Sequence, residues 1–247
     1  MATLSSLPEY AIACSKSREI VEHRPDYVAQ IRNEVPKYIY RRHPGLLERL
    51  SALLDATVIF AQDHAGTGVC VSKDGLILTC AHCLDDETIG ARRIVLFPDG
   101  RKCVVECVAK DDVRDCALMR VVQVDRKVVR ASDNISFPFA SLASQGALPC
   151  SLAFCIGQPA SDDEASNYPL FFTSRGVILG YQSSGEDLHR NDEIGQLIHS
   201  CWTYWGHSGA PIVNEDGLIV GMHSSWDDKT NRHGIPLEAI RAFMKSV

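Results

Sequence analysis

The chain has 247 residues, of which 45% are hydrophobic and 23% charged, as in an ordinary globular protein. Asp and Glu number 31 against 25 Lys and Arg, a formal net charge of −6. We therefore expect neither a nucleic-acid nor a membrane partner, since both need a basic patch. No apolar run approaches the ~20 residues of a membrane helix, and the N-terminal stretch lacks the pattern of a secretory signal. These features predict a soluble, cytoplasmic protein.

Residues 1–54 are predicted to form a helical N-terminal extension. Its clearest helix is marked by leucines at helical spacing, which give the segment one apolar face: Leu46, Leu47, Leu50, Leu53 and Leu54. An apolar face of this kind is unfavourable in water, so we expect it to pack on the rest of the protein. Three roles stay open for the extension: it could inhibit the protein, dock a regulatory partner or only pack.

From Thr57 onward the pattern changes to short β-branched runs separated by turns. Three Asp-Gly pairs lie between apolar runs, at residues 74–75, 99–100 and 216–217. Asp-Gly in this setting is the strongest short-range signal of a β-hairpin, because glycine accepts a positive φ without steric cost. The sequence therefore predicts an all-β body, followed by a short C-terminal helix that begins at Pro236.

Two of these hairpins share the pattern V-x-x-D-G-L-I, once at residues 71–77 and again at residues 213–219. The repeat is either a coincidence of two consensus hairpins or the sign of two similar β units. On the second interpretation the units are residues 55–130 and 148–247, joined by a linker at residues 131–147 that is poor in charge.

The 10 cysteines lie mostly inside apolar runs, where a free thiol behaves as a small buried hydrophobe. Without a secretory signal we expect reduced thiols rather than disulfides. Cys80 and Cys83 form a C-x-x-C pair, which could indicate zinc or redox chemistry. No second pair has matching ligand spacing, so we predict no metal site and no cofactor.

Three polar residues have the types and surroundings of a nucleophilic catalytic site. Ser208 lies in GHSG, His82 follows an apolar strand in LTCAHC, and Asp115 precedes another in DCAL. A serine nucleophile needs a histidine base, a carboxylate that orients the base, and two donors for the oxyanion, here the N–H groups of Gly206 and Ser208. Each residue alone also has a structural explanation: a turn serine, a strand-end histidine or a turn aspartate.

The blocks L-T-x-A-H-C, D-x-A-L and G-x-S-G-x-P, taken together, resemble the trypsin-like serine peptidases of the chymotrypsin fold over residues 55–243. The resemblance implies two Greek-key β-barrels, with His82 and Asp115 on the first and Ser208 on the second. It implies an intracellular serine protease, a hydrolase that forms an acyl-enzyme on protein substrates. Secreted members carry an aspartate before the serine for zymogen activation, and here that position is His207.

The resemblance also indicates where the side chain before the scissile bond would bind. The pocket walls would be residues 200–203 and 221–226, with Trp202 at the base. Thr203 and His223 resemble the pair that glutamyl endopeptidases use, and a histidine in this place also serves glutamine-specific viral relatives. Ser224 would offer its backbone to the substrate. We expect cleavage after Glu or Gln, unless His223 is only a strand histidine satisfied by backbone.

A second function class stays open from the sequence. The chain could be a catalytically silent scaffold or binding module that keeps the peptidase fold without turnover. Such proteins usually lose one of the three catalytic residues, and all three are present here.

Overall fold

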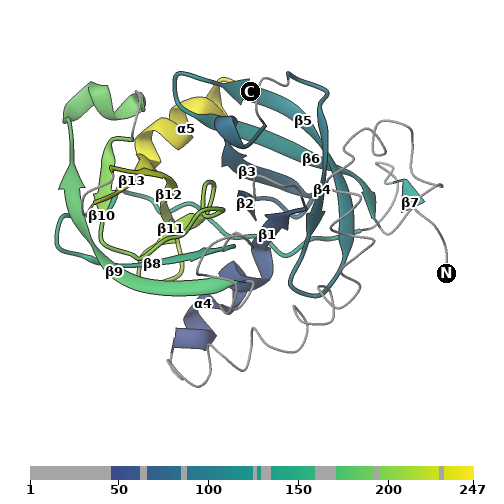
Figure 1. Ribbon diagram of the computed structural model, residues 1–247, viewed down its shortest axis with the longest axis horizontal. Coiled ribbons are helices and arrows are strands. Elements are labelled where there is room, and N and C mark those ends of the chain that lie inside the picture. Colours follow the sequence, from purple (N-terminus) through teal and green to yellow (C-terminus); the bar gives the residue numbers. More distant parts are fainter. Residues whose placement is uncertain are drawn as a thin grey trace.

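The computed structural model describes residues 46–61, 66–84, 88–124, 127–128, 135–158, 171–191, 195–227 and 231–247 (Figure 1). Most of the predicted N-terminal extension lies outside the described residues. Figure 1 shows two β-barrels side by side, the first in blue and teal at the right and the second in green and yellow at the left. Among the described residues, no helix has the length and apolar character needed to cross a membrane.

The first barrel is antiparallel throughout. Its strands are β1 (Thr57–Phe60), β2 (Gly66–Cys70), β3 (Leu76–Cys80), β4 (Arg92–Leu96), β5 (Lys102–Asp111) and β6 (Cys116–Val124), with β7 (Lys127–Val128) added on β6. Pairing of β3 with β6, from Leu76↔Arg120 to Cys80↔Cys116, closes the sheet. A short 3₁₀ helix, η2 (Ala81–Leu84), follows β3 directly.

The second barrel closes in the strand order β10-β13-β12-β11-β8-β9. Its strands are β8 (Leu152–Gly157), β9 (Phe172–Tyr181), β10 (Leu197–His199), β11 (Pro211–Val213), β12 (Ile219–Trp226) and β13 (Arg232–Pro236), with a 3₁₀ helix η4 (Gly185–His189) between β9 and β10. The all-β class and the two-barrel architecture expected from the resemblance are confirmed. The three Asp-Gly turns are confirmed as well, because each glycine has a positive φ: Gly75 (78°), Gly100 (85°) and Gly217 (77°).

The chain between the barrels touches both of them. The N–H of Ala140 donates to the carbonyl of Cys70 in the first barrel (2.9 Å), and the N–H of Ala143 donates to the carbonyl of Ile219 in the second (2.8 Å). One hydrophobic core cluster contains residues of both barrels, including Ile59 from β1 and Met222 from β12. The barrels are therefore packed together through apolar contact and fixed by backbone hydrogen bonds.

Within the ranges that the structure describes, two α-helices pack on the barrels. Helix α4 (Leu46–Ala56) buries Leu50, Leu53 and Leu54 in the core, as its leucine spacing predicted. Helix α5 (Leu237–Lys245) begins directly after Pro236, which cannot donate a backbone hydrogen bond and so suits a helix start. Its buried residues, at helical spacing, are Leu237, Ala239, Ile240 and Phe243.

Truncation of a buried α4 leucine tests whether this helix belongs to the folded core. Leu53 is 1% exposed, so Leu53→Ala should lower the free energy of unfolding by about 2–5 kcal/mol, from lost burial and the cavity left behind. The matched control Leu148→Ala truncates a leucine that is 73% exposed and should change stability by less than about 0.5 kcal/mol. Urea unfolding measures both, and equal losses would contradict the packing of α4.

Candidate active site

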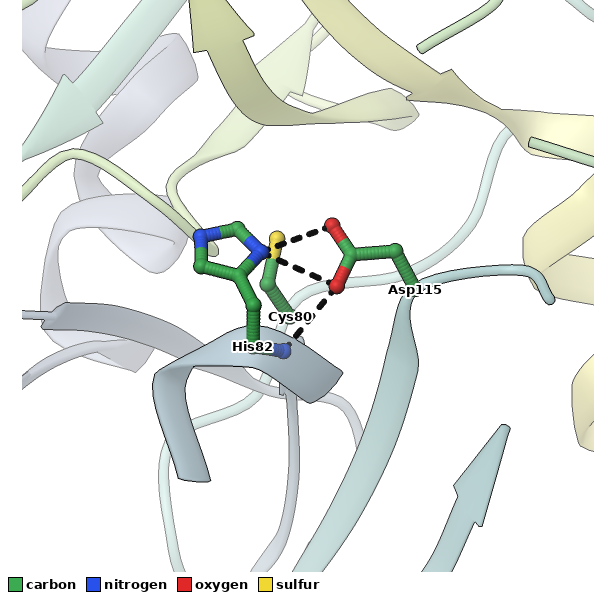
Figure 2. Close-up of side chains that lie close together, drawn as sticks. All are labelled: Cys80, His82 and Asp115. Carbon is green, nitrogen blue, oxygen red and sulfur yellow. Dashed lines mark hydrogen bonds and ion pairs between the residues drawn. The ribbon is translucent and has the colours of Figure 1, made fainter. Parts of the chain in front are cut away.

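The structure brings His82 and Asp115 into direct contact. The Nδ1 atom of His82 lies 2.9 Å from both carboxylate oxygens of Asp115, and its backbone N–H donates to Oδ1 at 3.0 Å (Figure 2). The two residues meet because β3 and β6 are paired at Cys80↔Cys116, which places η2 beside the residue that precedes β6. Asp115 has a φ of 52°, a left-handed conformation that aspartate tolerates better than most residues.

The environment of Asp115 keeps it ionised. Burial acts to raise the pKa of the carboxyl group, but the hydrogen bonds and charge of His82 outweigh burial, so that the pKa lies below its usual value. An ionised acceptor holds the proton of the imidazole on Nδ1. The other ring nitrogen, Nε2, points away from Asp115 in Figure 2, and in a neutral ring protonated on Nδ1 it is the basic nitrogen.

Ser224 connects this pair to Ser208. The Ser224 hydroxyl donates to Oδ2 of Asp115 at 2.9 Å, and the hydroxyl of Ser208 donates to the Ser224 carbonyl at 3.2 Å. The pairing register of β12 and β13 shifts between His223 and Ser225. This irregularity frees Ser224 from the strand ladder and lets it face both partners.

The turn that carries Ser208 is held against the first barrel. The backbone N–H of Thr67 donates to the Ser208 carbonyl at 2.9 Å, and the Thr67 hydroxyl donates to the Gly206 carbonyl at 2.7 Å. A Cβ atom on Gly209, whose φ is 86°, would lie 2.0 Å from the Thr67 carbonyl oxygen. Only glycine therefore fits at this position.

The N–H groups predicted to bind an oxyanion lie in this same turn. Within the described part of the chain, the N–H groups of Gly206 and Ser208 have no hydrogen-bond acceptor. The neighbouring N–H groups of His207 and Gly209 do have acceptors, the carbonyls of Tyr204 and His223. The turn thus leaves the two predicted donors available to a ligand.

Cys80 was not among the predicted site residues, yet its side chain lies beside the pair (Figure 2). The ligand atoms of Cys80, His82 and Asp115 are all within 4.8 Å of one another, and sulfur, nitrogen and oxygen together suit zinc. In this structure the thiol donates to the carbonyl of His223 at 3.3 Å, and burial raises its pKa well above the usual value. The sulfur is therefore a protonated donor that joins the two barrels.

His223 and Thr203, the two residues predicted to bind the substrate side chain, are both buried. The Nδ1 of His223 lies 3.2 Å from the Nε2 of His199, a buried residue of β10 that the sequence analysis missed. Burial lowers the pKa of His199 to about 3 and that of His223 well below its usual value, so both rings are neutral. No sequence signal marks His199, because its contact depends on β10 and β12 lying on either side of β13.

Two further positions that the resemblance singled out are Trp202 and His207. Trp202, expected at the pocket base, is 55% exposed, and the Cζ atom of Arg232 lies 4.6 Å from its ring centroid. His207 is fully buried, accepts the Tyr204 N–H on Nδ1 at 3.2 Å, and has its pKa lowered by burial to about 3. A neutral ring at this position cannot form the ion pair of zymogen activation.

The comparisons with known proteins agree with this geometry. A family model described as a trypsin-like peptidase domain matches residues 66–222. Serine protease HTRA1 of Xenopus laevis is 27% identical over 181 residues, which cover 73% of this chain and 35% of that protein. Serine protease HTRA4 of Homo sapiens is 24% identical over 185 residues, covering 73% of this chain and 34% of that protein. The chain thus spans about a third of the length of these curated relatives.

Among solved structures, a serine endoprotease from Yersinia pestis has the same fold. The TM-score is 0.62 at 19% sequence identity, over 82% of this chain and 66% of the other.

The buried neutral histidines predict a stability that depends on pH. His199, His207 and His223 have folded-state pKa values far below the usual 6.5, so the unfolded chain binds more protons between about pH 6.5 and pH 3. The contribution of these neutral histidines to the free energy of unfolding is fully present above the pKa of the unfolded chain. It decreases as the pH falls, by up to about 1.4 kcal/mol per pH unit for each histidine. Urea unfolding from about pH 7 to pH 5 measures the slope.

The variant His207→Gln removes one of these three histidines. The slope of the free energy of unfolding against pH should then decrease by the contribution of one histidine. An unchanged slope would mean that His207 is not held neutral in the folded protein.

Proposed function

Because this chain belongs to the trypsin-like peptidase family, we propose that it is a serine endopeptidase whose catalytic residues are His82, Asp115 and Ser208. The observation that carries the proposal is a hydrogen-bonded path between the barrels. Asp115 orients His82 at 2.9 Å, and the same carboxylate accepts the hydroxyl of Ser224, whose carbonyl holds the Ser208 hydroxyl. A base and a nucleophile are thus fixed relative to one carboxylate.

The chemistry follows from these positions. When a peptide enters, the Ser208 hydroxyl turns from the Ser224 carbonyl toward Nε2 of His82, which takes its proton as Oγ attacks the scissile carbonyl. Asp115 stabilises the imidazolium that results, and the N–H groups of Gly206 and Ser208 stabilise the tetrahedral oxyanion. His82 then protonates the leaving amine, and a water deprotonated by His82 hydrolyses the acyl-enzyme on Ser208.

For the residue before the scissile bond, we propose Glu or Gln. We assign the proton of the 3.2 Å contact to Nε2 of His199, because a proton on its other ring nitrogen, Nδ1, would be buried without an acceptor. A neutral His223 then accepts on Nδ1 and carries its own proton on Nε2. That N–H can donate to the side-chain oxygen of either residue, and the Thr203 hydroxyl can supply a second donor. His199 therefore acts as a positioning residue that sets the tautomer of His223.

We also propose protein substrates in the cytoplasm, with residues 1–54 available to a regulatory partner. The cysteines support a reducing compartment: all nine in the described part of the chain are free thiols, and burial raises the pKa of several, among them Cys70 and Cys201. The net charge of −6 supports substrates and partners other than nucleic acid or anionic membranes.

Substitution of the catalytic residues tests the activity. Ser208→Ala and His82→Ala should each abolish turnover of a peptide substrate, because the residues act as a unit. Asp115→Asn should lower kcat by ~10⁴, because an amide favours the wrong imidazole tautomer. A fluorophosphonate probe should label the parent and not Ser208→Ala, and an unlabelled, inactive parent would instead support the silent-scaffold alternative.

Substitution of His223 tests the pocket. The parent should cleave a peptide library after Glu or Gln, and His223→Ala should lose that preference while its fluorophosphonate labelling persists. Loss of the side-chain donor should lower kcat/KM for these peptides by about tenfold or more. Cleavage mainly after Lys, Arg or large aromatic residues in the parent would rule the pocket assignment out.

A further inference from the structure

Arg232 lies between the two predicted walls of the substrate pocket. It begins β13, where it pairs with Trp226 of β12 and with His199 of β10. Its Cζ atom is 4.6 Å from the ring centroid of Trp202 and 5.0 Å from that of Trp226. Trp202 belongs to the wall that leads to Ser208, and Trp226 ends the other wall. The guanidinium is thus stacked between one side chain from each wall.

This cation has no anionic partner within the described residues. Arg232 is only 7% exposed, its Nε is buried without a hydrogen-bond partner, and no carboxylate of the described residues lies within ion-pair distance. The carboxylate of Asp227 attracts the guanidinium of Arg232 from beyond ion-pair distance. The same carboxylate lies 3.6 Å from Nε2 of His233. A buried cation without a paired anion costs free energy, which the two aromatic faces offset only in part.

Arg232 also dominates the charge of its surroundings. The rings of His199, His207 and His223 are all buried and neutral, and the positive charge of Arg232 helps to lower their pKa values. Among the described residues that act on the pKa of His223, Arg232 is the arginine, and its guanidinium carries a full positive charge. The N–H groups of a guanidinium can donate to both oxygens of a carboxylate. A carboxamide has only one oxygen, and its NH₂ group is a donor that cannot accept from the guanidinium.

We propose that Arg232 binds the carboxylate of an acidic substrate side chain, Glu or Asp, and so selects acidic residues over glutamine before the scissile bond. His223 supplies a neutral N–H donor to the same carboxylate, and Arg232 supplies the charge. A substrate Lys or Arg would face a like charge and be rejected. This inference rests on the proposed function, since it concerns the pocket that adjoins Ser208.

The test compares peptides that differ only in the residue before the scissile bond: Glu, Asp, Gln or Lys. We expect kcat/KM of the parent for Glu to exceed that for Gln by about tenfold or more, with Lys the poorest. Arg232→Gln should lower the Glu/Gln ratio by about tenfold or more, and Arg232→Lys should restore most of the loss, because it keeps the charge. Thermal unfolding checks that each variant is folded.

The matched control is Arg175→Gln, which removes an exposed arginine from β9 of the same barrel and should leave the Glu/Gln ratio at the parent value. An Arg232→Gln ratio equal to that of the parent, an Arg232→Lys ratio equal to that of Arg232→Gln, or a parent that prefers Gln would each overturn the inference. Fluorophosphonate labelling separates this failure from failure of the proposed function: a labelled parent without acidic preference refutes only the role of Arg232, whereas an unlabelled parent refutes the peptidase assignment.

Discussion

The carboxylate of Asp115 is the group on which the site depends. It accepts hydrogen bonds from the ring and the backbone of His82 in the first barrel and from the hydroxyl of Ser224 in the second. A buried carboxylate is stable only with such donors, so its own requirement for hydrogen bonds aligns His82 and the strand that contacts Ser208. The geometry of the proposed triad and the contact between the barrels therefore depend on the same atoms.

The turn that carries Ser208 is held by hydrogen bonds to its backbone carbonyl groups. Thr67 of β2 holds the carbonyls of Ser208 and Gly206, and the thiol of Cys83 lies 3.5 Å from the Ser208 carbonyl. These contacts occupy the carbonyl groups of Gly206 and Ser208, while the N–H groups of the same two residues have no acceptor in the part of the chain that the structure describes. The close approach at Gly209 excludes any side chain there, so the turn cannot relax without moving β2.

Different residues of the second barrel would supply hydrogen bonds and positive charge to the proposed pocket. His199 and His223 are neutral because burial disfavours their protonated forms, and they act through directed N–H groups. The charge lies on Arg232, whose pKa burial lowers only from a very high starting value, so that it stays protonated. In the proposed pocket, a carboxylate would be distinguished from a carboxamide without a protonated histidine.

The sequence by itself determined the local features of this protein. The Asp-Gly turns, the leucine face of α4 and the helix start after Pro236 were predictable because each depends on the conformation of a few consecutive residues. The blocks around His82, Asp115 and Ser208 were recognisable because each motif consists of a few consecutive residues. Tertiary structure alone decided the pairing of His199 with His223 and the stacking of Arg232 between Trp202 and Trp226. These contacts join different segments of the barrel wall, and their energy arises only when strand order and register bring the side chains together.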